Sequence, residues 1–308
     1  MKIAVMGAGA LGGYFGGRLA NAGHEVTLIA RGAHLAALQT NGLQIKSPNG
    51  DLHLRKISAT DDPADVGPVD VVMMMVKTYD LAAAGQLAKA MVADQTMVIT
   101  CQNGVSAPDI LAPILGAGRI VPGVARILGE VSAPGVIRHN APLDILILGE
   151  RDTTISERVR TFYDALKNAG TSPTIAENIN HELWSKFIGQ STLASITTLT
   201  RLDLGPLLDC PQSGQLIRDA MSEVERVGHA VDSNLPRGLA EHNFAFLSKF
   251  PRHMHASMLD DLSRGKPLEI EALSGDVVRL GAAHGVPTPI HAVFASALQP
   301  FAGGTPEP

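Results

Sequence analysis

The chain contains few aromatic side chains, few cysteines and no excess of basic charge. Phe, Trp and Tyr make up 4% of its 308 residues, and the only cysteines are Cys101 and Cys210. Two cysteines cannot build a disulfide framework, so we expect a reducing, cytoplasmic location. Lys and Arg number 25 against 30 Asp and Glu, which gives a net charge of −5. The basic footprint of a nucleic-acid-binding protein is therefore absent.

Long hydrophobic runs are also missing. No window reaches the roughly 18 apolar residues that a membrane span needs, so we expect no membrane partner. The N-terminal sequence MKIAVMGAGALGG has one positive charge and a short apolar run. A secretory signal needs a longer apolar stretch and a cleavage site. We interpret this segment as a buried strand followed by a glycine-rich loop.

Strand and helix patterns alternate in the first half of the chain. Strands are expected at 2–6, 24–30, 69–76, 97–100 and near 173, with β runs through 120–149 and helices at 14–21, 33–38, 81–92, from about 107, and at 156–168. This alternation predicts an α/β domain with a Rossmann-type doubly wound sheet.

The second half has a helical pattern throughout. Helices are expected at 180–199, 211–231, 238–249, 254–264, 267–284 and 289–300. We therefore predict a Rossmann-type domain over 1–177, an all-helical substrate and catalytic domain over 178–302, and a flexible tail over 303–308.

The glycine-rich loop fits a dinucleotide-binding fingerprint. Gly7, Gly9 and Gly12 form G-x-G-x-x-G directly after the first predicted strand. The first glycine permits a tight turn, the second lets a pyrophosphate approach the backbone, and the third lets helix and strand pack closely. The intervening Ala8, Ala10 and Leu11 then belong to the same cofactor-binding loop. A glycine-rich turn without a ligand is the alternative.

Arg31 indicates which dinucleotide is bound. An NAD enzyme usually carries Asp or Glu at the end of the second strand, whereas this chain has Ala30 followed by Arg31. A guanidinium pairs with the 2′-phosphate that distinguishes NADP from NAD. We therefore predict NADPH/NADP+ as the cofactor and 1–177 as its binding domain. A solvated surface arginine is the alternative.

Lys77 and Asn103 follow two further predicted strands. Ligands of open α/β sheets bind outside the carboxyl ends of the strands. Their positions make both residues candidates for cofactor binding, although polar residues are common where loops begin.

Lys186 is the candidate catalytic residue. It is the only charge between Glu182 and Arg201, and its neighbours include Trp184 and Phe187. Desolvation disfavours an ammonium group and lowers its pKa from about 10.4 towards the range in which proton transfer is efficient. Such a lysine could stabilise and protonate the alkoxide that forms when a ketone is reduced. The alternative is a lysine whose head reaches solvent.

Two residues of the last third of the chain are candidate partners. We expect Pro267 to open a helix, which places Glu269 in the first turn as a counter-charge for Lys186. The helix dipole alone would also favour a carboxylate there. Ser257, one predicted helix earlier, is either a binding hydroxyl or a core hydroxyl bonded to its own helix.

The whole chain resembles the ketopantoate reductase (2-dehydropantoate 2-reductase) family. The segments that carry the resemblance are MGAGALGG with Arg31, VKTYD at 76–80, QNGV at 102–105, ELWSKF at 182–187, SML at 257–259, LEIEALSG at 268–275 and HGVPTP at 284–289. The resemblance implies NADPH-dependent reduction of 2-dehydropantoate to pantoate, in pantothenate biosynthesis.

The resemblance also implies residue roles. Lys186 would be the general acid, and Asn103 would contact both nicotinamide and substrate. Ser257 would bind the substrate carboxylate. Glu269 would be part of the catalytic set, holding the cofactor or the substrate hydroxyl near Lys186.

The chain departs from the family pattern four and eight residues after the lysine. The family usually has Asn at both positions, whereas this chain has Gln190 and Ala194. Gln190 could still donate an amide hydrogen bond to the substrate, but Ala194 cannot. A different 2-oxo acid is therefore an alternative substrate, and a non-catalytic NADP(H)-sensing protein is an alternative function.

Other classes of site and mechanism find little support. A hydroxyisobutyrate-type dehydrogenase also has a Rossmann domain, a helical domain and a lysine, but Arg31 and the Ser257…Glu269 pair weigh against it. His253 and His255 lack the further ligands of a metal site, so no metal is expected. The partner is a small 2-oxo acid, and the apolar helices make a homodimer plausible.

Overall fold

The structure is a computed structural model that describes residues 1–306, and the chain divides into two compact units. The first comprises Met1–Gln102 and Ala107–Ile179, and the second comprises Asn103–Ser106 and the chain from Asn180 onward. The short segment Asn103–Ser106 thus groups with the helical unit, although it directly follows a strand of the sheet.

The first unit is built on one ten-stranded sheet. Its strands are β1 (Lys2–Met6), β2 (Glu25–Ile29), β3 (Leu43–Lys46), β4 (Leu52–Leu54), β5 (Ser58–Thr60), β6 (Val71–Met74), β7 (Met97–Thr100), β8 (Ile120–Ala133), β9 (Val136–Leu148) and β10 (Ser172–Ile175). The order is β4-β3-β9-β8-β7-β6-β1-β2-β5, with β10 beside β9. Neighbours from β7 to β5 are all parallel, as expected for a Rossmann-type sheet.

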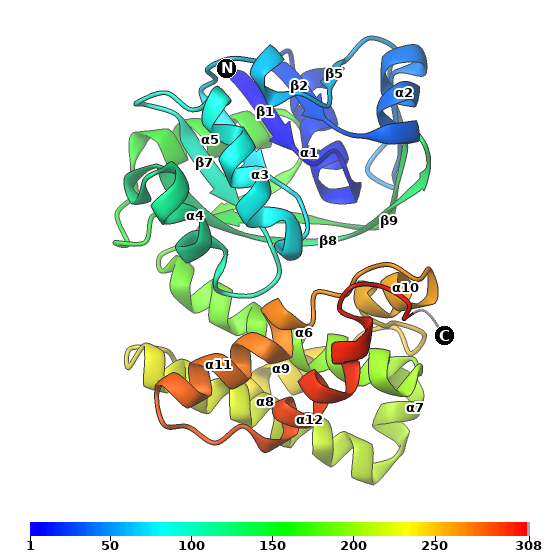
Figure 1. The fold of residues 1–308 in the computed structure, drawn as a ribbon, viewed down its shortest axis with the longest axis vertical. Helices are drawn as coiled ribbons and strands as arrows, with labels where there is room; N and C mark the ends of the chain where they lie inside the picture. The colour runs from blue at the N-terminus through cyan, green and yellow to red at the C-terminus, as the bar shows by residue number, and fades with distance from the viewer. Residues whose placement is uncertain (307–308) are drawn as a thin grey trace. The chain divides into compact units, whose positions relative to one another are not determined.

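Helices cover both faces of this sheet. They are α1 (Ala10–Asn21), α2 (Gly32–Asn41), α3 (Leu81–Ala88), α4 (Ala107–Leu115) and α5 (Glu157–Asn168), with short 3-10 turns between them (Figure 1). Alternate residues of a strand point to opposite faces. Val5 of β1 packs in one core with Phe15 of α1, while Met6 packs in the other with Leu81 of α3 and Leu111 of α4. The α/β part of the predicted fold is therefore confirmed.

The sheet extends further than the sequence patterns indicated. The short strands β3, β4 and β5 were not expected, because each has only three or four residues. The expected β runs of 120–149 form two long strands, β8 and β9, which pair as an antiparallel hairpin (Figure 1). Register shifts interrupt the pairing, which accounts for the broken hydrophobic pattern of this region.

The second unit is helical. Its helices are α6 (Ile179–Thr200), α7 (Leu204–Asp209), α8 (Pro211–Val231), α9 (Leu239–Leu247), α10 (Ser257–Ser263), α11 (Asp276–Ala283) and α12 (Pro289–Leu298), with the π-helical turn η5 (Glu271–Gly275) before α11. One hydrophobic core joins Phe187 and Ile188 of α6 with Met221 of α8 and Phe294 of α12. The all-helical prediction for this half is confirmed.

The prediction of one helix over 267–284 is wrong in its first third. Residues 266–269 are not helical, and the chain turns through η5 before α11 begins at Asp276. Glu269 therefore precedes the helix instead of lying in its first turn. Leu268, Glu269 and Ile270 are all buried, so this stretch has no solvent-facing side. Tertiary burial here overrides the helix-starting preference of Pro267.

The far end of the chain packs on the second unit. Thr305 donates its backbone N–H to the carbonyl of Gly265. Residues 307–308 of the expected tail lie outside the described residues. Among residues 1–306, no helix has the length and apolar character to cross a bilayer.

We predict that Gly12→Ala lowers the free energy of unfolding by about 3 kcal/mol, because overpacking against rigid backbone is destabilising. A Cβ at Gly12 would lie 2.1 Å from the carbonyl oxygen of Gly7, whereas one at Gly9 would meet nothing within 4 Å. Gly9→Ala is the matched control and should change the stability by less than about 0.5 kcal/mol. Urea unfolding measures both, and equal stabilities of the two variants would contradict the packing argument.

Candidate functional site

The loop between β1 and α1 is shaped by its glycines. Gly7 has φ +105°, a conformation that side chains with a Cβ rarely adopt. The backbone N–H groups of Gly7 and Ala8 donate to the carbonyl of Ile29, at 3.2 and 3.0 Å, which ties the loop to the end of β2. The close approach of Gly12 to Gly7 brings α1 directly against this turn.

The same loop fits a phosphate group. Open space lies around Gly9, where a Cβ would have no neighbour, so a ligand can approach the backbone there. Gly9 is the N-cap of α1, no side chain caps the helix, and its first turn has no acidic residue. Free N–H groups and the positive end of the helix dipole favour an anion at such a position. The residues present therefore suit the pyrophosphate of a dinucleotide.

Two predicted cofactor residues lie at the same edge of the sheet as this loop. β6, β1 and β2 are adjacent and parallel, so their carboxyl ends share one edge. Arg31 follows β2 as the exposed N-cap of α2, and the half-buried Lys77 follows β6 at the start of a 3-10 turn. The strand order runs from β1 through β2 to β5 on one side and through β6 to β7 on the other. Doubly wound sheets bind nucleotides at such a switch point, outside the carboxyl ends of the strands.

Gln102 also belongs to this edge, and sequence reasoning missed it. Its side-chain amide donates to the carbonyls of Met74 and Val76, at 2.7 and 3.0 Å, and so ties the end of β7 to the end of β6. The amide oxygen of Gln102 is buried without a hydrogen-bond partner in the described structure. The QNG motif pointed to this position, but Asn103 alone was selected from it.

The predicted catalytic and substrate residues all lie in the helical unit. Lys186 and Gln190 are half-buried on α6, one helical turn apart, and Glu269 is buried, with 6% of its surface exposed. Asn103 is half-buried in the segment that groups with this unit, whereas Ser257 is exposed as the first residue of α10. Elements far apart in sequence therefore supply these five side chains to one unit.

Two aromatic neighbours of Lys186 in the sequence lie in the core of the helical unit. Trp184 and Phe187 are buried and meet edge to face, with ring centroids 5.6 Å apart. Lys186 itself is only partly exposed. A half-buried lysine has fewer water molecules around its side chain than a fully exposed one.

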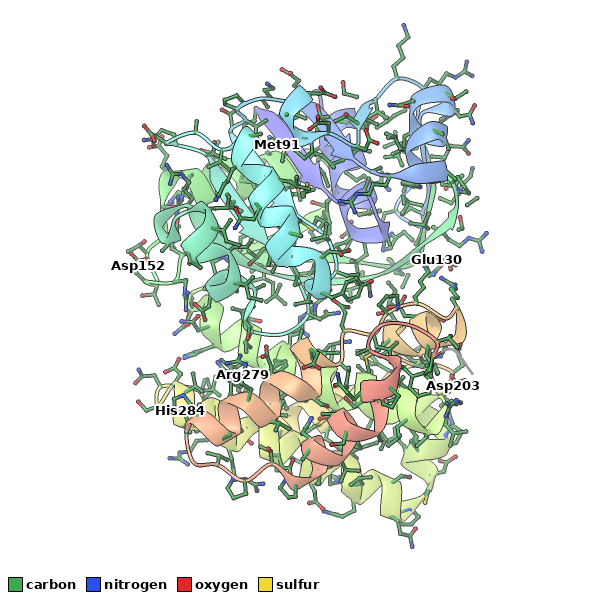
Figure 2. The ribbon with its side chains drawn as sticks, viewed as in Figure 1. Met91, Glu130, Asp152, Asp203, Arg279 and His284 are labelled. Atoms are coloured by element: carbon green, nitrogen blue, oxygen red, sulfur yellow. The ribbon has the colours of Figure 1, made fainter. Side chains whose placement is uncertain are left out.

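His255 has carboxylate partners that sequence reasoning did not find. Its two ring nitrogens lie 2.8 Å from Asp203 and 3.3 Å from Asp260. Burial alone would lower the pKa of His255, but the hydrogen bonds to both aspartates outweigh it and raise the pKa. Asp203 is the N-cap of α7 (Figure 2), and Asp260 lies in α10. The bridge therefore fixes the start of α10, where Ser257 lies.

A fully buried chain of hydroxyl groups links α6 to the segment after Glu269. Ser195 and Ser274 are 2.6 Å apart, and Ser274 lies 2.9 Å from Nδ1 of His291. Nε2 of His291 lies 3.2 Å from the carbonyl of Ala220, so it must carry the proton and donate. Nδ1 then accepts from Ser274, which in turn accepts from Ser195. No sequence motif marked this chain, because its members come from three separate helical segments.

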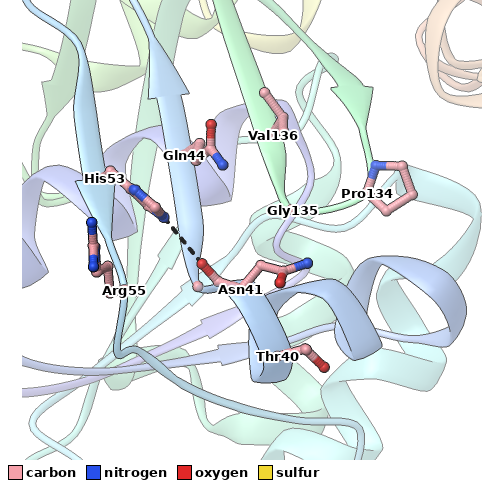
Figure 3. Close-up of a pocket in the computed structure, with 9 residues that line it drawn as sticks. Thr40, Asn41, Gln44, His53, Arg55, Pro134, Gly135 and Val136 are labelled. Atoms are coloured by element: carbon pink, nitrogen blue, oxygen red, sulfur yellow. Dashed lines mark hydrogen bonds between the residues drawn. The ribbon is translucent and has the colours of Figure 1, made fainter.

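A shallow pocket of about 490 Å³ lies elsewhere in the first unit (Figure 3). It is lined by Thr40, Asn41, Gly42, Gln44, His53, Arg55, Pro134, Gly135 and Val136. Nε2 of His53 donates to the carbonyl of Asn41 at 3.1 Å. None of the predicted site residues lines this pocket.

Comparison with known proteins agrees with this geometry. Residues 3–153 match the family model described as ketopantoate reductase PanE/ApbA, and residues 178–302 match that of its C-terminal part. The chain belongs to the ketopantoate reductase family. The 2-dehydropantoate 2-reductase of Mesorhizobium japonicum is 32% identical, and the alignment covers 96% of each chain.

Solved structures share the whole fold. A PanE/ApbA family ketopantoate reductase from Ralstonia eutropha has a TM-score of 0.89 at 32% identity, with 97% of each chain covered. A D-mandelate dehydrogenase bound to NADH and anilino(oxo)acetate has a TM-score of 0.87 at 21% identity, with 97% of each chain covered, and this likeness concerns the fold alone. Family membership makes the chain an oxidoreductase.

Two positions at which the chain departs from the usual family pattern have different environments. Ala194 is completely buried in the core of the helical unit, whereas Gln190 is half-buried. Replacing a buried amide by a methyl group removes a polar group that would need hydrogen-bond partners.

Among the described residues, no group of three or more His, Cys, Asp or Glu could hold a metal ion.

We predict that stability falls between pH 6.5 and 4 because of His291. Burial lowers the pKa of this residue to about 4. The unfolded chain takes up a proton near pH 6.5 while the folded protein does not, so the contribution is complete above pH 6.5 and is lost as the pH falls towards 4. It amounts to on the order of 3 kcal/mol. Urea unfolding at a series of pH values measures it.

His291→Gln should flatten this pH dependence, whereas replacing the exposed His284 by Gln should leave it unchanged. The control separates the effect of the buried ring from that of removing any histidine. An identical slope in wild-type protein and His291→Gln would refute the assignment.

Proposed function

We propose that this protein reduces a 2-oxo acid to a 2-hydroxy acid with NADPH, and that 2-dehydropantoate, reduced to pantoate, is its first candidate substrate. The observation that carries the proposal is the family match across both units, 3–153 and 178–302. Lys186, Glu269 and the glycine-rich loop stand at the positions where the family resemblance expects its functional residues.

The residues that would hold the cofactor belong mainly to the sheet unit. The loop from Gly7 to Gly12 offers N–H groups and open space for the pyrophosphate, and Arg31 offers a guanidinium for the 2′-phosphate. Lys77 and Asn103 are proposed as further contacts. When bound, NADPH supplies a hydride to the carbonyl carbon of the substrate.

Lys186 is proposed as the proton donor. As the carbonyl oxygen gains negative charge, the ammonium group stabilises it and then transfers one proton, which yields the hydroxyl group of the product and a neutral amine. The buried carboxylate of Glu269 is proposed to orient the substrate hydroxyl or the cofactor. Ser257 and Gln190 can donate hydrogen bonds to the substrate, and Ser257 is the proposed carboxylate contact.

The buried Ala194 favours a second candidate substrate class. A site with one amide donor fewer loses about 1–3 kcal/mol towards a substrate that needs that contact. A 2-oxo acid with an apolar side chain in place of the hydroxyl group of 2-dehydropantoate would not incur that loss. Another branched or bulky 2-oxo acid is therefore the alternative.

We predict that NADPH oxidation, followed at 340 nm, is stimulated by one member of a panel of 2-dehydropantoate, 2-oxoisovalerate, oxaloacetate and pyruvate. Lys186→Ala should lower kcat by about a thousandfold, the range expected for loss of a general acid, while the Kd for NADPH stays unchanged. Lys167→Ala, which removes an exposed lysine of α5, is the matched control and should keep full activity. Tight NADPH binding without turnover of any 2-oxo acid would favour a sensor instead.

We also predict that Arg31→Ala raises the Kd for NADPH about tenfold and leaves the Kd for NADH unchanged. The exposed guanidinium is expected to gain its binding energy from the 2′-phosphate alone. Fluorescence titration with both nucleotides gives the two constants, and Arg160→Ala on α5 serves as the control for loss of an exposed arginine. A wild-type preference for NADH would overturn the assignment of Arg31.

A further inference from the structure

The segment Asn103–Ser106 is held by the helical unit through a closed set of hydrogen bonds. The hydroxyl of Ser106 donates to Oδ2 of Asp276, the first residue of α11. Arg279, labelled in Figure 2, donates to Ser106 Oγ at 3.0 Å and to Oδ1 of Asp276 at 3.0 and 2.7 Å. Three side chains from two segments about 170 residues apart therefore form hydrogen bonds with one another.

The bond between Ser106 and Asp276 is the stronger half of this set. The carboxylate of Asp276 is buried, with 10% of its side chain exposed, whereas 59% of the Arg279 side chain is exposed. Water and salt weaken the exposed ion pair. A hydroxyl donating to a buried carboxylate keeps its strength, and removing it leaves part of that charge without a donor.

Gly104 anchors the same segment at a second point. It has φ +101°, and a Cβ there would lie 2.7 Å from the carbonyl oxygen of Ala272. The backbone of the segment therefore lies directly against η5. Two contacts, at Gly104 and at Ser106, fix the chain immediately after Asn103 onto residues 272–279.

The surface that receives the segment is itself fixed from within. Ser274 of η5 is bonded to Ser195 and His291, all three fully buried. The N–H of Gly275 donates to the carbonyl of Ile270 at 2.9 Å, which closes the π-helical turn. This turn begins two residues after Glu269, so one element both receives the segment Asn103–Ser106 and anchors the chain that carries Glu269.

We propose that Ser106 and Asp276 are positioning residues, which hold the amide of Asn103 in register with the helical unit that carries Lys186 and Glu269. This inference rests on the proposed reductase function. If so, Ser106 affects turnover only by fixing the position of Asn103. A displacement of about 1 Å in a positioning element can cost up to a hundredfold in rate.

A double-mutant cycle on kcat/KM tests this consequence. Ser106→Ala should lower kcat/KM for the 2-oxo acid by about tenfold in the wild-type background and should have no further effect in Asn103→Ala. Ser106→Thr, which retains the hydroxyl group, should restore most of the activity. Additive losses in the double variant, or a Thr variant as impaired as Ala, would overturn the proposal.

A second measurement does not depend on turnover. Hydrogen–deuterium exchange of the peptide that contains 103–106 should be faster in Ser106→Ala than in wild-type protein, because its attachment to α11 is lost. The control is Ser222→Ala, which removes a half-buried hydroxyl that donates to the carbonyl of Arg218 in its own helix α8. It should alter neither the exchange of this peptide nor kcat/KM.

The two measurements separate failure of this inference from failure of the proposed function. A wild-type protein inactive on every 2-oxo acid overturns the reductase function and the catalytic role of Asn103, while faster exchange in Ser106→Ala still supports the attachment. An active protein whose 103–106 peptide exchanges equally in wild type and Ser106→Ala overturns the attachment.

Discussion

The contact of Gly12 with the carbonyl of Gly7 is the constraint from which the nucleotide edge of the sheet follows. It permits α1 to begin immediately after β1, with its N-terminus beside the ends of β2 and β6. Any side chain at Gly12 would separate helix from strand, and the N–H groups at Gly9 would no longer face open space. The helix packing and the open space at Gly9 thus both depend on the absence of a Cβ at Gly12.

The parts of the molecule that the sequence predicted have strong local signals. The glycine spacing, the apolar run of β6 and the long, sparsely charged sequence of α6 are local patterns, and they led correctly to a doubly wound sheet and a helical second half. Arg31 and Lys77 became candidates because strand ends share one edge of a parallel sheet. That argument needs only the strand order, which right-handed crossovers restrict to few possibilities.

What the sequence could not predict depends on contacts between distant segments. The short strand β5 exists because β2 offers an edge for it, and the irregular stretch around Glu269 exists because Leu268 and Ile270 are both buried in the core of the helical unit. The partners of His255 and Ser106 lie 52 and 170 residues away in the sequence. The preference of proline for the start of a helix is weak compared with such burial. The sequence therefore predicted Glu269 inside a helix, whereas the helical turn begins only after it.

The grouping of Asn103–Ser106 with the helical unit has a consequence for dissecting this protein. A cut near residue 179, where sequence patterns change from mixed to helical, would leave the helical half without the hydroxyl that Asp276 accepts from and without the backbone that covers Ala272. The carboxylate would face a gap that water would enter. Joining the segment 103–106 to the helical half through a short linker would be needed to keep that surface closed.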